Sequence, residues 1–99
     1  MDKLKKDILR LLRKHRKLSR QELANLTGEN DRIVRKAIGE LREEGHMIGI
    51  TSSGGYSINN KTDFHRAIAI YKARAGKEQK RIKAMQRTLE HVGQLRMQI

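Results

Sequence analysis

The sequence predicts a small, mostly α-helical protein with one short β-hairpin and a long helix at its C-terminal end. Three observations lead to this fold class. Apolar residues recur at helical spacing in three short segments of the first half of the chain. A glycine-containing segment, TSSGG, separates two short apolar runs that alternate as strands do. From about residue 62 onward, helical periodicity continues with no proline to stop it.

The composition indicates one small basic domain. The chain has 99 residues, with 23 Lys and Arg against 11 Asp and Glu, and a formal net charge of +12. The net charge is +7 over residues 1–20, −2 over 21–60 and +7 over 61–99. Basic ends of this kind either contact a polyanion, above all nucleic acid, or are ordinary solvated helix faces. Only 36% of the residues are hydrophobic, so the core is modest and dimerisation would add to it.

Several functional classes are disfavoured or excluded. The absence of cysteine excludes disulfides, thiolate metal sites and cysteine nucleophiles. The four histidines have no ligand spacing, so we expect neither a metal nor a cofactor. No phosphate loop, carboxylate pair or catalytic triad is recognisable, so an enzyme is not expected. No apolar run approaches the length of a bilayer span, which predicts a cytoplasmic protein without a membrane partner.

Apolar spacing and a capping motif predict the first two helices. The first should span residues 2–15, with one apolar stripe and cations elsewhere. After a break over 16–18, Ser19 and Glu22 have the spacing of a capping box, which starts the second helix. Gly28 should end that helix, because glycine readily adopts the left-handed conformation. The inward side chains of the second helix are expected to be Leu23, Ala24 and Leu26.

A third helix and a hairpin follow. Asn30 or Asp31 can cap the helix, and Gly45 should close it. Its apolar face is expected to hold Ile33, Val34, Ala37, Ile38 and Leu41. Its exposed face is expected to hold Arg32, Arg35, Lys36, Gly39 and Arg42. Two short strands, over 47–50 and 56–58, are predicted next. Their shared buried face should consist of Ile48, Ile50, Tyr56 and Ile58.

This order of elements is that of a winged helix-turn-helix. The segment SRQELANLTGENDRIVRKAIGELREEGHMIGITSSGGYSI resembles the DNA-binding half of biotin-ligase repressors and small phage-encoded winged-helix proteins. The resemblance covers residues 5–60 and includes the Gly-Gly-Tyr entry into the last strand. It implies that the helix over 30–44 enters the DNA major groove and that the hairpin over 47–58 lies along the backbone or in the minor groove. Unlike many winged helices, this chain has no Lys or Arg in its hairpin.

The candidate DNA-binding residues come from three regions of this domain. Arg32, Arg35 and Lys36 lie on the first two turns of the third helix, where guanidinium groups suit the O6 and N7 atoms of guanine. The alternative is that they are solvated charges on an exposed helix, and Asn30 has a competing role as a helix cap. Hydroxyl groups in the hairpin can bind phosphate oxygens, although a plain exposed hairpin is the alternative. The complete set is Arg16, Lys17, Arg20, Asn30, Arg32, Arg35, Lys36, Thr51, Ser52 and Ser53.

The C-terminal segment has a coiled-coil pattern. From Phe64, apolar residues follow a 4-3 alternation, interrupted at Glu78 and Arg96. A helix of about 35 residues would reach about 50 Å, which exceeds the width of a small domain. We therefore expect residues 1–60 to form the DNA-binding domain and 61–99 a dimerisation segment, with 64–75 folding onto the domain and 82–99 reaching a partner. The alternative is one helix packed wholly on its own domain. The expected dimerisation residues are Phe64, Ile68, Tyr71, Ile82, Met85, Leu89 and Val92.

The sequence therefore predicts a protein that binds double-stranded DNA sequence-specifically. The resemblance implies a small phage or prokaryotic transcription regulator acting as a homodimer, nucleoid-associated or in the host cytoplasm if phage-encoded. One alternative is a non-specific architectural or replication-accessory protein, which would bind every duplex with a similar salt dependence. Another is a protein-protein interaction module built on a winged helix.

Overall fold

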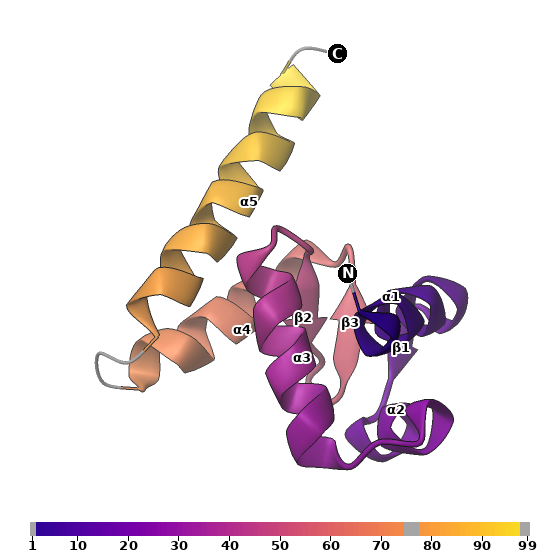
Figure 1. The fold of residues 1–99 in the computed structure, drawn as a ribbon. Coiled ribbons are helices and arrows are strands. Elements are labelled where there is room, and N and C mark those ends of the chain that lie inside the picture. The colour runs from indigo at the N-terminus through magenta and orange to yellow at the C-terminus, as the bar shows by residue number, and fades with distance from the viewer. Residues whose placement is uncertain (1, 75–77, 98–99) are drawn as a thin grey trace.

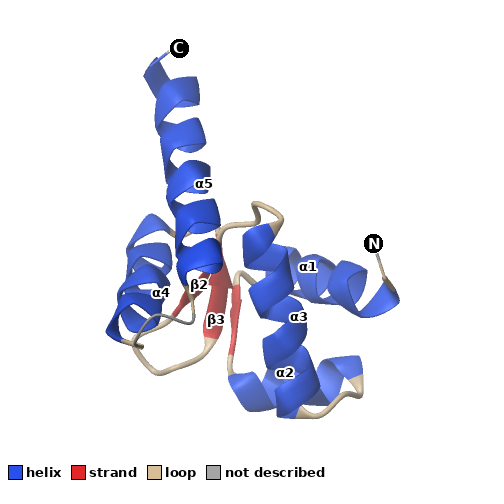
Figure 2. Ribbon diagram, turned by 60° about the vertical axis from the view of Figure 1, so that its left-hand side comes forward, coloured by secondary structure: helices blue, strands red, loops and turns tan. Residues whose placement is uncertain are grey.

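The computed structural model describes residues 2–74 and 78–97 of the chain. Its elements are α1 (Lys3–His15), β1 (Lys17–Leu18), α2 (Arg20–Thr27), α3 (Asp31–Glu43), β2 (Ile48–Ile50), β3 (Tyr56–Ile58), α4 (Lys61–Ala73) and α5 (Gln79–Met97). Helices α4 and α5 pack beside the sheet and α3 (Figure 1). In Figure 2 the sheet stands between α4 and the group formed by α1, α2 and α3. The predicted fold class, a mostly helical winged helix-turn-helix followed by a C-terminal helical segment, is confirmed.

The predicted caps of α2 and of the start of α3 are present. Ser19 Oγ accepts a hydrogen bond from the Glu22 amide at 3.0 Å, and the Glu22 carboxylate accepts one from the Ser19 amide at 2.8 Å. Gly28 ends α2 in the left-handed conformation with φ 75°. Asn30 caps α3, because its side-chain oxygen accepts a hydrogen bond from the amide of Ile33 at 3.0 Å. These bonds satisfy helix-end groups that would otherwise lack partners.

Replacing Ser19 with alanine should lower the free energy of unfolding by about 1 kcal/mol, the usual cost of losing an N-cap side chain. Urea unfolding at neutral pH measures this change. Gln21→Ala on the same helix is the control, because its exposed side chain does not cap the helix end. Equal stabilities of Ser19→Ala and Gln21→Ala would contradict a stabilising role for the cap.

The same capping box predicts a pH dependence. The hydrogen bond from the Ser19 amide lowers the pKa of Glu22. A carboxyl group whose pKa is lowered by folding stabilises the protein above its unfolded pKa, about 4.3, and this contribution is lost as the pH falls through the folded value. The difference in stability between the natural protein and Glu22→Gln should therefore be present at neutral pH and shrink in acid. A pH-independent difference would contradict this linkage.

Burial departs from the prediction at four positions of α2 and α3. Leu26 and Ile33, expected inward, are 53% and 41% exposed. Gly39 and Arg42, expected on the exposed face, are buried. The reason for the second error is that later parts of the chain cover this face: Arg81 of α5 lies against Gly39, and Arg42 donates hydrogen bonds to the Ile48 carbonyl in β2 and the Tyr71 hydroxyl in α4. Leu23 is buried as expected, and Ala24 is half-buried.

The sheet has a third strand that sequence reasoning missed. The order is β1-β3-β2, with both pairs antiparallel and β3 in the centre. Strand β1 occupies part of the predicted break, where Leu18 is buried and pairs with Tyr56. Two residues are too short for an alternating pattern to be recognised. On the predicted hairpin face, Ile48, Tyr56 and Ile58 are buried, whereas Ile50 is half-buried.

The prediction of one continuous C-terminal helix is wrong. Helix α4 packs on β2, and α5 returns to pack on α3 and α4. The reversal explains why the helix-length argument fails, since the described chain measures only 39 × 35 × 28 Å. The 4-3 pattern that starts at Phe64 also includes Ala75 and Ile99, which lie outside the described residues, and nothing is described of the Arg96 side chain. No described helix combines the length and apolar character needed to cross a membrane.

Most of the predicted dimerisation seam is buried inside the chain itself. The described residues form two hydrophobic clusters, one among α1, α2, α3 and the sheet and a second one around the C-terminal helices. The second hydrophobic cluster contains Met47, four residues of α4 and two of α5, with Leu89 and Val92 half-buried at its edge. Its members from the predicted seam are Phe64, Ile68, Tyr71, Ile82 and Met85, which are between 0 and 6% exposed. The 4-3 pattern is therefore used to pack α4 and α5 within one chain, and these five residues are not available to a partner in this conformation.

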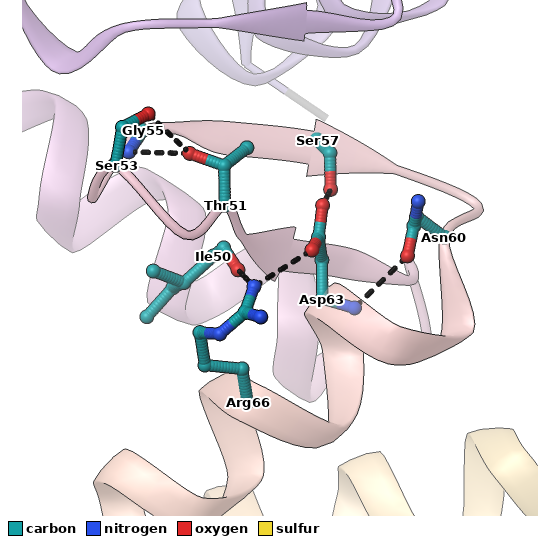
Figure 3. A network of polar contacts seen from close by, with 8 residues as sticks. All are labelled: Ile50, Thr51, Ser53, Gly55, Ser57, Asn60, Asp63 and Arg66. Atoms are coloured by element: carbon teal, nitrogen blue, oxygen red, sulfur yellow. Dashed lines mark hydrogen bonds and ion pairs between the residues drawn. The ribbon is translucent and has the colours of Figure 1, made fainter.

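A polar network joins the start of α4 to the hairpin (Figure 3). Asp63 lies at its centre, where it accepts hydrogen bonds from Ser57 Oγ at 2.7 Å and from Arg66 Nη1 at 2.8 Å. The same Arg66 nitrogen donates to the carbonyl of Ile50 at 2.9 Å, and Asn60 caps the helix through the Asp63 amide. Both strands of the hairpin are thus held by the first two turns of α4.

Candidate nucleic-acid interface

Helices α2 and α3, with the turn between them, form the helix-turn-helix unit. Gly28 reverses the chain, and Asn30 starts α3 with its side chain bonded to the helix's own backbone. On the first two turns of α3, Arg32, Arg35 and Lys36 are all exposed. This is the part of a recognition helix that meets base edges in the major groove.

One carboxylate organises two of the predicted DNA-binding cations. Asp31 Oδ1 accepts a hydrogen bond from Arg20 Nε at 3.0 Å, and Asp31 Oδ2 lies 3.2 Å from Arg35 Nε. The hydrogen bond from Arg20 lowers the pKa of Asp31, so this carboxyl is ionised at neutral pH. Asp31 therefore orients both guanidinium groups while offsetting part of their charge. Arg32 and Lys36, in contrast, form no ion pair with a described residue.

Four other predicted residues meet at a second place. Lys17 on β1 and the hairpin loop line a hollow of about 270 Å³, which we call the hairpin pocket. The predicted residues that line it are Lys17, Thr51, Ser52 and Ser53. Thr51 Oγ1 accepts a hydrogen bond from the Gly55 amide at 2.9 Å, whereas the side chain of Ser52 is exposed (Figure 3 shows the loop). Arg16, just before Lys17, is exposed and has a positive φ of 71°.

A second concave site lies between the helix-turn-helix unit, the hairpin and the C-terminal helices. This arginine pocket is a hollow of about 230 Å³ lined by Arg20, Arg35, Arg42, Arg74 and Arg81 together with Tyr56 and Tyr71. Of these five arginines, only Arg20 and Arg35 were among the predicted DNA-binding residues. The other three come from α3, the end of α4 and α5. Arg35 and Arg42 are seven residues apart, about two helical turns, so they lie on one face of α3. This spacing is visible in the sequence and could have indicated that the two arginines belong to one site.

Tyr71 is the aromatic centre of the arginine pocket. The guanidinium carbons of Arg42, Arg74 and Arg81 lie 5.5, 5.8 and 5.6 Å from the centroid of its ring. These distances are in the range of cation-π contacts. Nearby, burial raises the pKa of Tyr56, which keeps its hydroxyl protonated at neutral pH.

The described residues contain no group of three or more His, Asp or Glu side chains placed to hold a metal ion. The side chains that this surface presents are guanidinium, ammonium and hydroxyl groups, which recognise anions. Guanidinium groups bind both guanine edges and phosphate oxygens, and ammonium and hydroxyl groups bind phosphate oxygens.

Comparison with known proteins identifies the N-terminal part of the chain. A family model described as an HTH domain matches residues 4–57, which extend from α1 into β3. Neither curated proteins nor solved structures give a significant match. The matched range contains all ten predicted DNA-binding residues and ends before α4 and α5 begin.

Proposed function

The chain belongs to the helix-turn-helix domain family, whose members bind DNA, and from this premise we propose that it is a sequence-specific transcription regulator. The observation that carries the proposal is the arrangement at the start of α3. Arg32, Arg35 and Lys36 are exposed there, and Arg32 and Lys36 are not engaged by described acidic residues. These cations are therefore available to a base edge or a phosphate.

The proposed mechanism separates reading from positioning. Arg32 and Arg35 contact base edges in the major groove, where a guanidinium group can donate two hydrogen bonds to one guanine. Lys17 and the hydroxyls of Ser52 and Ser53 bind backbone phosphates, which set the orientation of the protein on the duplex. Asp31 keeps Arg35 oriented before DNA arrives, which reduces the entropy lost on binding.

We also propose that the regulator acts as a homodimer on an inverted repeat, as helix-turn-helix proteins with two-fold symmetry do. Because five of the seven seam residues are buried, the contact between protomers would have to use the exposed surface of α5 near Leu89 and Val92. Sedimentation equilibrium of the natural protein and of Val92→Glu measures the molecular mass in solution and so tests this contact. A monomeric mass at micromolar concentration would contradict the dimer.

Selection of bound duplexes from a random library at about 150 mM salt tests the proposed function, because non-specific binding is weakened at that salt. Enrichment of one sequence supports a regulator, and an inverted repeat with half-sites about 10 base pairs apart supports a dimer. Binding without enrichment would instead favour the architectural alternative. Absence of binding would favour the protein-interaction alternative.

Arg32→Ala should weaken binding to the selected duplex by about 1–3 kcal/mol and reduce discrimination at one base pair, because a bidentate base contact is lost. Fluorescence anisotropy with the selected and a scrambled duplex measures both effects. Arg87→Ala is the matched control: it removes the same charge from an exposed position on α5, beside Glu43 and Glu44 at the opposite end of α3. Equal losses in the two variants would exclude Arg32 from base reading.

A further inference from the structure

We infer that the arginine pocket is a binding site for a phosphate group, an assignment that goes beyond recognition of bases by α3. Five arginines line the pocket, and none of the described side chains that line it is acidic. Asp31, Glu43 and Glu78 lie nearby, and among the described residues their partners from the pocket are Arg20, Arg35 and Arg81. The five guanidinium groups of the pocket therefore outnumber the three carboxylates that pair with them among the described residues.

Arg42 is the strongest indication of a missing anion. Its residue is only 3% exposed, and it forms no ion pair with a described residue. Nε donates to the carbonyl of Ile48 and Nη1 to the hydroxyl of Tyr71, both at 2.7 Å. Nη2 is buried without a hydrogen-bond partner among the described residues. A buried cation without a counter-ion is costly, so an anion in the pocket would offset an existing electrostatic penalty.

Arg81 and Arg74 complete the cationic wall from the C-terminal helices. Arg81 lies against α3 at Gly39, where an added Cβ would be only 2.6 Å from its guanidinium carbon. Glu43 and Glu78 each hold Arg81 at 3.3 Å, and its Nε is buried without a partner among the described residues. Arg74 is exposed beside Tyr71 and is not engaged by a described carboxylate. The absence of a side chain at Gly39 thus makes room for one of the five cations.

The chemistry of the lining favours phosphate over other anions. Guanidinium groups donate paired hydrogen bonds that match the spacing of phosphate oxygens, and several can surround one tetrahedral group. The Tyr71 hydroxyl accepts from Arg42 and still has its own proton to donate. At about 230 Å³, the pocket has room for a phosphate or pyrophosphate group.

The occupant would act on the DNA-binding surface. Arg20 and Arg35 belong both to this pocket and to the Asp31 cluster at the start of α3. A phosphate in the pocket would compete with Asp31 for their guanidinium groups and change how Arg35 is presented to DNA. The phosphate group can belong to a small phosphorylated molecule or to the DNA backbone. A small molecule would occupy the pocket without DNA, whereas a backbone phosphate would occupy it only in the complex with DNA.

Pyrophosphate titration at constant ionic strength tests the inference, with isothermal calorimetry as the readout and no DNA present. The natural protein should bind one equivalent of pyrophosphate saturably. Arg74→Gln should bind pyrophosphate about tenfold more weakly, because one charge-assisted contact is lost. Arg87→Gln removes an equal charge outside the pocket and should bind as the natural protein does. This result would assign the site to a small phosphorylated molecule.

Duplex binding tests the other source, a phosphate of the DNA backbone. If pyrophosphate does not bind, Arg74→Gln should still weaken duplex binding more than Arg87→Gln does and reduce the salt slope by about one, as loss of one phosphate contact requires. The inference is overturned if Arg74→Gln and Arg87→Gln are indistinguishable in both titrations. It is also overturned if Arg42→Met, shown to be folded by circular dichroism, binds both ligands as tightly as the natural protein. Absence of sequence enrichment would reject the proposed regulator without changing the pyrophosphate result.

Discussion

Replacing Gly49 with alanine should destabilise the protein by about 3 kcal/mol, at the upper end of the usual cost of overpacking. Gly49 lies in β2, directly under the first turn of α4. A Cβ at this position would be 2.5 Å from the carbonyl carbon of Asp63 and 2.6 Å from the amide nitrogen of Phe64. These are backbone atoms in a helix, so they cannot swing aside as a side chain can. The methyl group must therefore push α4 away from the sheet.

Urea unfolding measures this change, and Gly39→Ala is its matched control. The added methyl group at Gly39 would meet only the guanidinium end of Arg81, which can move, and alanine is favoured over glycine in a helix by about 1 kcal/mol. We expect Gly39→Ala to be within about 1 kcal/mol of the natural protein. If Gly49→Ala were equally well tolerated, the close packing of α4 on β2 would be contradicted.

Replacing Met85 with alanine should cost about 3 kcal/mol, within the range for truncating a buried methionine. Met85 is 0% exposed in the second hydrophobic cluster, where α5 packs with α4 and α3. Truncation leaves a cavity inside one chain. The loss should therefore be the same at low and high protein concentration when unfolding is followed by circular dichroism.

Leu89→Ala, one turn further along α5, is the comparison for Met85→Ala. Leu89 is half-buried at the edge of the same cluster, so its truncation should cost clearly less. An intermolecular coiled coil predicts the opposite pattern, in which both substitutions lower the unfolding midpoint in a concentration-dependent way. That result would contradict the intrachain packing of α5.

The helix-turn-helix region was predictable because its signals are local. A capping box needs only Ser19 and Glu22, a left-handed helix end needs only Gly28, and an N-cap needs only Asn30. Each of these interactions joins residues within about four positions, so each can be seen in the sequence. The same locality explains why the exposed cations on the first two turns of α3 could be assigned before the structure was known.

The C-terminal half was predicted less well because periodicity specifies which side chains share a face and not what covers that face. The seam that contains Phe64 and Met85 is apolar as expected, but its partners are α3, β2 and the other C-terminal helix of the same chain. For the same reason Gly39 and Arg42 were assigned to solvent, since the residues that cover them, Arg81 of α5 and Tyr71 of α4, lie far away along the chain. A two-residue strand such as β1 carries too little pattern to be recognised.

Residue type and local spacing were therefore sufficient for the first three helices, the hairpin, the helix-turn-helix family and the exposed cations on the first two turns of α3. Only the tertiary structure shows the reversal between α4 and α5 and the arginine pocket that it completes. That pocket combines Arg20, Arg42 and Arg81 from three helices, and no short-range rule relates these positions. Its charge becomes informative only when burial is known, because an arginine in water needs no partner and a buried one does.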